Sequence, residues 1–206
     1  MRFVFRFLQF AFQVCLRLLF RIQVQGREHI PRRGKLILAA NHISGYDPFV
    51  IGALVPRVLY FLAKKELFRN LLLGAALRVL LHAIPVDRRD IGHTTVRRIN
   101  ELLAAGEAVL LFPEGTRSRS GQIGEGKSGV GMLAAANHAD IMPVRVDGLH
   151  GGRGSLWRRP HIKVVFGPVL AVAPFLQNGT ATKEIYRQIT TAVLDQIRAM
   201  GQAVTA

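Results

Sequence analysis

The chain alternates short apolar runs with helical patterns, and this order predicts its elements. Residues 22–26 alternate apolar and polar side chains like an edge strand, whereas residues 36–40 and 108–112 are unbroken apolar runs typical of buried strands. Further strands are predicted over residues 58–63, 141–146 and 162–166. Helices are predicted over residues 48–54, 67–81, 94–105, 127–137 and 182–200. The alternation favours a single α/β domain with a mostly parallel or mixed central sheet flanked by helices.

The first 21 residues combine a narrow polar stripe with a wide apolar face. The polar side chains recur at spacings of three and four residues, at Arg2, Arg6, Gln9, Gln13, Arg17 and Arg21. This pattern is typical of a helix lying in the headgroup region of a bilayer. The longest uncharged run, residues 7–16, is ten residues long, whereas a span needs about 20. We predict an amphipathic membrane-associating helix over residues 1–21; a helix packed on its own domain and a tilted span are the alternatives.

The composition adds a large positive charge to this picture. The sequence carries 28 Lys and Arg against 13 Asp and Glu, a formal net charge of +15, and half of its residues are hydrophobic. Such a surface fits anionic lipid headgroups or nucleic acid phosphates. The surplus of apolar residues favours an anionic membrane surface, and not nucleic acid, as the partner. A basic nucleic-acid-binding protein is the alternative from a different functional class. Cys15 is the only cysteine, so no intrachain disulfide can form.

Two polar segments directly follow the predicted buried strands. His42 and Asp47 come after strand 36–40, and Glu114 and Arg117 come after strand 108–112. Polar groups and ligands collect at strand ends of α/β sheets, so we expect a functional site there. A histidine with a carboxylate supplies a base with an orienting acid, and an arginine grips anions. This set suits the transfer of an acyl group to a phosphorylated alcohol.

The same two segments resemble the glycerolipid acyltransferases, particularly the bacterial 1-acylglycerol-3-phosphate acyltransferases. The spacing from His42 to Asp47 and residues 114–118 (EGTRS) match two motifs of that family, while residues 83–88 (AIPVDR) and 141–144 (IMPV) resemble two more, in the family's order. The resemblance covers roughly residues 22–170 and implies an acyltransferase domain over residues 22–206. It further implies acyl-CoA or acyl-carrier protein as donor and 1-acylglycerol 3-phosphate or another lysophospholipid as acceptor. We expect no cofactor and, from the amphipathic helix and the composition, a peripheral or monotopic location at the cytoplasmic face of the cell membrane. A lyso-ornithine lipid is an alternative acceptor.

His42 is the candidate general base of this reaction. Its ordinary pKa of about 6.5 leaves the ring largely neutral at pH 7, and Asp47 would hold the imidazole in one tautomer and stabilise the imidazolium. Asp47 before Pro48 is also a common helix N-cap arrangement, and a lone histidine at a strand end can be structural. We predict no metal site, because the other histidines stand singly without ligand spacing.

The resemblance assigns the remaining site residues to acceptor binding. Arginines at these motif positions bind the acceptor phosphate, which carries that role to Arg88 and Arg117. Glu114, Gly115 and Thr116 match acceptor-site positions, and Lys127 is a further candidate cation. Two alternatives are open: Glu114 is a partner that holds Arg117, and Lys127 is a solvated residue at the head of a helix.

The acyl chain needs an apolar environment. Residues 67–81 form the most apolar internal stretch, and together with residues 49–55 they could wall a tunnel. A stripe of leucines is more often ordinary core, which is the simpler interpretation of this stretch.

Overall fold

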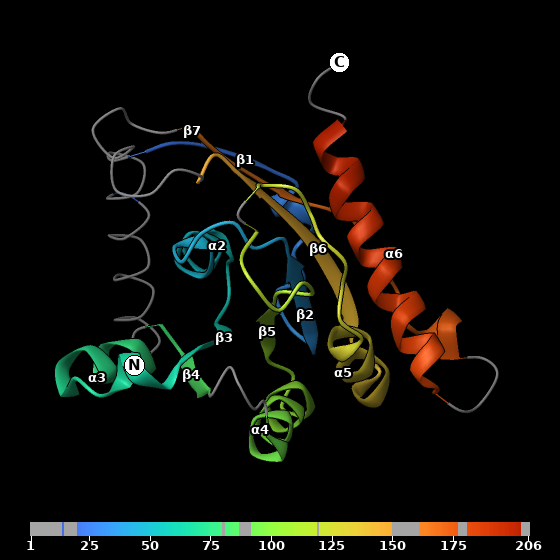
Figure 1. Ribbon diagram of the computed structural model, residues 1–206, viewed down its shortest axis with the longest axis horizontal. Coiled ribbons are helices and arrows are strands. Elements are labelled where there is room, and N and C mark those ends of the chain that lie inside the picture. Colours follow the sequence, from blue (N-terminus) through green and yellow to red (C-terminus); the bar gives the residue numbers. More distant parts are fainter. Residues whose placement is uncertain are drawn as a thin grey trace.

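One mixed sheet of seven strands lies at the centre of the described chain (Figure 1). The computed structural model describes residues 14, 20–79, 81–86, 92–118, 120–149, 161–176 and 181–202. The strands lie in the order β1-β7-β6-β2-β5-β3-β4. Their bounds are Arg21–Gln25 (β1), Leu36–Ala40 (β2), Leu59–Lys64 (β3), Ala83–Val86 (β4), Ala108–Leu111 (β5), Asp140–Asp147 (β6) and His161–Phe166 (β7). Neighbouring strands pair parallel except for β6 and β7, which are antiparallel.

Helices cover both faces of this sheet. The α-helices are α2 (Asp47–Leu54), α3 (Leu71–Val79), α4 (His93–Ala104), α5 (Gly129–Asn137) and α6 (Lys183–Gln202). Short 3₁₀ helices are η1 (Arg27–His29), η2 (Lys65–Phe68) and η4 (Ala173–Leu176). The predicted single α/β domain with a mixed sheet flanked by helices is therefore confirmed. Among the described helices, none is both long and apolar enough to cross a membrane.

The central strand β2 is buried on both of its faces. Leu36 and Leu38 belong to one core cluster, with residues of α2 and α3, whereas Ile37 and Ala39 belong to a second cluster with residues of α4, α5 and α6. Successive side chains of a strand point to opposite faces. The unbroken apolar run of β2 thus follows from its position between two helical layers.

The pattern of the sequence locates most elements to within two residues and misplaces a few. The stretch predicted as one helix over residues 67–81 is instead η2 followed by α3. Phe68 and Gly74 approach closely at this break: a Cβ at Gly74 would lie only 2.9 Å from the carbonyl oxygen of Phe68. Strand β4, four residues that include Pro85, was not predicted. The predicted helix over residues 1–21 lies outside the described residues except for Val14, Phe20 and Arg21, and Arg21 is the first residue of β1.

The register of the parallel strands brings their carboxyl ends to one edge. Leu38 of β2 and Phe61 of β3 both pair with Leu110 of β5, which lies between them. His42 follows the end of β2, and Glu114 follows the end of β5. The two polar segments singled out in the sequence therefore meet at this edge.

Close packing of α5 on α6 gives a test of the fold. A Cβ at Gly131 would overlap the carbonyl oxygen of Tyr186, whereas nothing lies within 4 Å of a Cβ at Gly129, in the same helix. We expect Gly131→Ala to lower the free energy of unfolding by about 1–3 kcal/mol, because α5 must move outward. Chemical denaturation measures this loss. Gly129→Ala is the matched control, and an equal loss in both variants would contradict the packing.

Candidate active site

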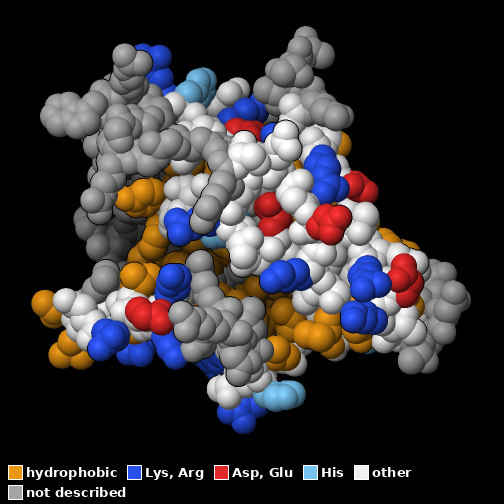
Figure 2. All heavy atoms as spheres, in the orientation of Figure 1, with side chains coloured by type: hydrophobic (Ala, Val, Ile, Leu, Met, Phe, Trp, Pro, Cys, Tyr) orange, Lys and Arg blue, Asp and Glu red, His pale blue; other side chains and the backbone are white. Residues whose placement is uncertain are grey.

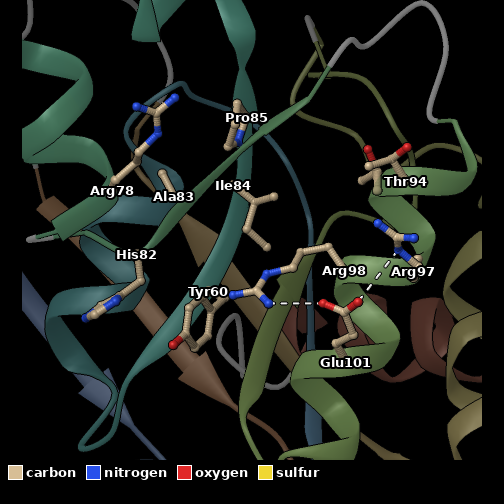
Figure 3. Close-up of a pocket in the computed structure, with 11 residues that line it drawn as sticks. Tyr60, Arg78, His82, Ala83, Ile84, Pro85, Thr94, Arg97, Arg98 and Glu101 are labelled. Carbon is tan, nitrogen blue, oxygen red and sulfur yellow. Dashed lines mark hydrogen bonds and ion pairs between the residues drawn. The ribbon is translucent and has the colours of Figure 1, made fainter. Parts of the chain in front are cut away.

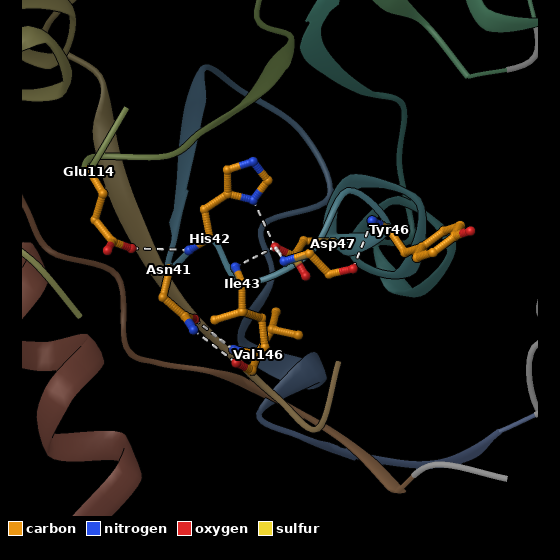
Figure 4. A network of polar contacts seen from close by, with 8 residues as sticks. Asn41, His42, Ile43, Tyr46, Asp47, Glu114 and Val146 are labelled. Carbon is orange, nitrogen blue, oxygen red and sulfur yellow. Dashed lines mark hydrogen bonds and ion pairs between the residues drawn. The ribbon is translucent and has the colours of Figure 1, made fainter. Parts of the chain in front are cut away.

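A buried histidine and a buried aspartate form the centre of the site. The Nδ1 atom of His42 lies 2.8 Å from Oδ2 of Asp47, and the two residues are 4% and 0% exposed. The same oxygen accepts the backbone N–H groups of Ile43 and Ser44, each at 2.8 Å (Figure 4). An ionised carboxylate only accepts hydrogen bonds, so Nδ1 carries the proton. The second ring nitrogen, Nε2, points away from Asp47 and is left as an acceptor (Figure 4).

Asp47 does not cap its helix, contrary to one expectation from the Asp-Pro pair. It is the first residue of α2, the N-cap position falls on Tyr46, and no side chain caps the helix. The carboxylate instead turns back over the loop that precedes it. Its other oxygen, Oδ1, is buried without a hydrogen-bond partner among the described residues. Oδ2 therefore makes all of these contacts at the N-terminal end of α2, where the helix dipole favours a negative charge.

Glu114 binds the backbone of His42 and does not pair with Arg117. Its Oε1 accepts the His42 backbone N–H at 3.1 Å, and its Oε2 accepts the N–H of Gly124 at 3.0 Å. The His42 carbonyl oxygen in turn accepts the Ser118 N–H at 2.7 Å. The ion pairs between described residues include none from Glu114 to Arg117. Glu114, which is 9% exposed, thus joins the histidine loop to the loop after β5.

Phe112 and Asn41, which are not among the predicted site residues, also position the histidine. The Phe112 ring stacks on the His42 ring, with centroids 4.0 Å apart and an interplanar angle of 20°. The Asn41 side chain bonds both the N–H and the carbonyl oxygen of Val146, each at 2.8 Å, which ties the end of β2 to β6. Their only signal in the sequence is that each stands directly beside a motif.

The candidate cations lie on the loop after β5 and on its continuation. A Cβ at Gly45 would lie 3.7 Å from Nη1 of Arg117, so the guanidinium lies beside the histidine loop. A Cβ at Gly115 would lie 3.3 Å from Nζ of Lys127, and Gly115 has φ +70°. Arg117, Lys127 and Thr116 are all exposed. Gly115 is required here for its backbone conformation and for the room it leaves to the lysine.

The structure therefore brings most of the sequence candidates to one place. His42, Asp47 and Glu114 are in direct contact, and Arg117 lies beside their loop. Arg88 lies outside the described residues. No group of three or more His, Cys, Asp or Glu that could hold a metal ion occurs in the described part of the chain.

A cavity of about 420 Å³ lies along β3, β4 and α4 (Figure 3). Ile84 and Pro85, within the second motif, line it together with Tyr60, His82 and Arg98. Burial lowers the pKa of the His82 imidazole and raises the pKa of the Tyr60 hydroxyl. His42 and Asp47 are not among the lining residues, so this cavity does not contain the histidine–aspartate pair.

Comparison with known proteins identifies the class to which this fold and site belong. Residues 21–147 match the model of the Acyltransferase family. The chain belongs to this family, and the prediction that it is an acyltransferase is confirmed. All of the described site residues in the two polar segments, together with Lys127, fall within the matched range.

Individual proteins of known activity or structure are similar to this chain. The chain is 29% identical to a 1-acyl-sn-glycerol-3-phosphate acyltransferase of Bacillus subtilis over 95% of this chain and 96% of that protein. It is 31% identical to a lyso-ornithine lipid O-acyltransferase of Rhizobium meliloti over 71% of this chain but only 52% of that protein. In fold, it is similar to the crystal structure of the acyltransferase PlsC of Thermotoga maritima, with a TM-score of 0.76, 22% identity, and coverage of 100% of this chain and 81% of that one.

The two bonds of Glu114 predict a kinetic signature. Glu114→Ala leaves the His42 N–H without its acceptor, so we expect kcat to fall by about 10- to 100-fold through misplacement of the ring, with the acceptor KM little changed. Glu114→Gln keeps one acceptor oxygen and should fall between this variant and the wild type. Steady-state kinetics, with thermal unfolding as the control for folding, measure these effects. A raised acceptor KM at unchanged kcat would show instead that Glu114 binds substrate.

Proposed function

We propose that this acyltransferase moves a fatty acyl group from a thioester, acyl-CoA or acyl-carrier protein, to the free hydroxyl of 1-acylglycerol 3-phosphate. The product is phosphatidate, a precursor of phospholipids. The observation that carries the proposal is the buried His42–Asp47 pair with the Arg117 guanidinium beside its loop. The Bacillus subtilis relative, matched over 96% of its length, supports the choice of acceptor.

The base in this reaction is the Nε2 atom of His42. It takes the proton of the acceptor hydroxyl while that oxygen attacks the thioester carbonyl carbon. The tetrahedral intermediate then collapses: the carbon–sulfur bond breaks, and the imidazolium returns the proton to the leaving sulfur. The new bond is an ester, and no acyl-enzyme is formed. The proton thus passes from oxygen to sulfur through a single side chain.

Asp47 and Glu114 serve this step in different ways. The Asp47 carboxylate is fully buried 2.8 Å from Nδ1, where it stabilises the imidazolium as it forms. Glu114 fixes the backbone of His42, and Phe112 limits rotation of the ring by stacking on it. A ring held at Nδ1 and on one face, on a fixed backbone, loses little entropy on reaching the reactive geometry.

The acceptor phosphate is assigned to the cations around the histidine loop. Arg117 offers a planar fork of donors suited to two phosphate oxygens, and Lys127 adds a charge beside Gly115. Arg88 is a third candidate, through the resemblance of residues 83–88 to the second motif of the family. Gly115 and Thr116 supply the exposed backbone between the carboxylate and the arginine.

The substrate and the product are lipids, so the enzyme should work at a membrane. The net charge of +15 suits the anionic cytoplasmic face of the cell membrane. A peripheral or monotopic attachment, with the residue 1–21 helix in the headgroup region, is the form of association that we propose.

A lyso-ornithine lipid is the second candidate acceptor, because the Rhizobium meliloti relative acts on that lipid by name. An ornithine headgroup is zwitterionic, with an ammonium group beside its carboxylate, whereas a phosphate monoester offers Arg117 and Lys127 nearly two negative charges and no opposing cation. A phosphate is therefore the better match. Comparing kcat/KM for the two acceptors separates the candidates.

The first test removes the base. We expect His42→Ala to lower kcat by about 10²- to 10⁴-fold, because the hydroxyl proton has no acceptor. Free thiol released from acyl-CoA in the presence of 1-acylglycerol 3-phosphate measures turnover. His161→Ala, at an exposed histidine at the start of β7, is the control and should keep full activity. Wild-type turnover in folded His42→Ala would refute the mechanism.

The second test removes the phosphate donor group. We expect Arg117→Ala to raise the acceptor KM by roughly tenfold or more, the effect of losing a charge-assisted hydrogen bond, while the donor KM is unchanged. Arg187→Ala, at an exposed arginine of α6, is the matched control. A raised donor KM with a constant acceptor KM would reassign Arg117 to the thioester carrier.

A further inference from the structure

The beginning of α3 displays large apolar side chains to the solvent. Leu71 and Leu72 are 84% and 83% exposed, and Leu67 of the adjoining η2 is 44% exposed. Leu77, further along the same helix, is buried in the core. Figure 2 shows apolar side chains projecting at the lower left, where Figure 1 places α3. Large apolar side chains grouped in one short segment and turned to solvent are typical of a site of interaction.

Exposed basic residues accompany these leucines along the same segment. Residues 64–78 hold four Lys and Arg against a single acidic residue, Glu66. Lys64, Arg69 and Arg78 are exposed, and the guanidinium of Arg78 lies over the Phe68 ring, 5.1 Å from its centroid. Projecting leucines among basic residues are complementary to anionic headgroups above an acyl-chain layer.

The surface lies at the same edge of the sheet as the histidine. Leu38 and Phe61 are level, because both pair with Leu110. His42 stands four residues beyond Leu38, and Lys65, the first residue of η2, stands four residues beyond Phe61. Strands β2 and β3 are separated by two strand spacings, about 10 Å. Contact with a membrane at η2 would therefore turn the catalytic edge toward the lipid.

We infer that residues 64–72 form a lipid-docking tip. Leu71 and Leu72 insert among the acyl chains of an anionic leaflet, while Lys64 and Arg69 contact the lipid phosphates. This inference rests on the proposed membrane association and adds the surface that orients the enzyme. A bilayer fits better than a protein partner, because the leucines project singly into solvent from the first turn of α3, among basic residues, and line no part of the cavity along β3, β4 and α4.

A reporter at the tip tests the inference in the full chain. In a Cys15→Ser background, Leu72→Cys provides a single site for an environment-sensitive fluorophore. Val169→Cys is the matched control: Val169 is 37% exposed, and its neighbour Leu170 pairs with Ile141 near the start of β6, at the opposite edge of the sheet. The probe is a phosphatidylcholine vesicle with or without phosphatidylglycerol.

We expect the fluorophore at position 72 to shift to shorter wavelength with phosphatidylglycerol vesicles and to be quenched by nitroxide-labelled lipid. The fluorophore at position 169 should stay in water. An unchanged emission at position 72, in protein that sediments with the vesicles, would overturn the inference. A response to an acidic acyl-carrier protein without one to vesicles, or to protein concentration alone, would overturn it equally.

Substitution separates the tip from the chemistry. Leu71→Ser with Leu72→Ser should lower partition to anionic vesicles by about tenfold or more, and lower turnover of vesicle-embedded lysolipid while leaving turnover of detergent-dispersed lysolipid intact. Lys64→Glu with Arg69→Glu should weaken binding to anionic vesicles and reduce its salt dependence. His42→Ala should keep the fluorescence response at position 72. Catalysis and membrane docking can thus be lost separately, which distinguishes a failure of this inference from a failure of the proposed function.

Discussion

The hydrogen bond from His42 to Asp47 is the interaction on which the site depends. One buried carboxylate oxygen accepts the imidazole N–H and two backbone N–H groups of the loop between the two residues. The side chain of Asp47, at the end of this loop, thus holds both the loop backbone and the imidazole in place. Any shift of α2 moves the carboxylate, and with it both the ring and the loop that presents the ring.

This arrangement needs a parallel sheet beneath it. Strands β2 and β5 end at the same edge, which lets Glu114 reach the His42 backbone across 72 residues of sequence and lets Phe112 stack on the ring. Asn41 anchors the end of β2 to β6 on the other side. The histidine is consequently held by three consecutive strands, and its immobility is a property of the whole sheet centre.

The apolar and polar pattern of the sequence located most strands and the histidine–aspartate pair, because both are local signals. An unbroken apolar run such as residues 36–40 is distinctive, and so is a histidine followed five residues later by an aspartate. The role of Glu114 depends on a contact across the fold, and its neighbour Arg117 suggested a different partner. The break between η2 and α3 brings Phe68 close to Gly74, a contact that apolar periodicity does not encode. Strand β4 has only four residues, one of them Pro85, so the apolar pattern does not predict it.

The antiparallel pairing of β6 with β7 has a consequence for how the chain enters the domain. Because β1 runs parallel to β7, it runs opposite to β2, and its first residue, Arg21, lies at the edge where β2 ends. Arg21 therefore lies at the same edge as the histidine, beyond β7, while η2 leaves this edge on the far side of β5. In the proposed membrane-bound state, contacts on both flanks of the histidine would fix the tilt of the enzyme as well as its distance from the bilayer.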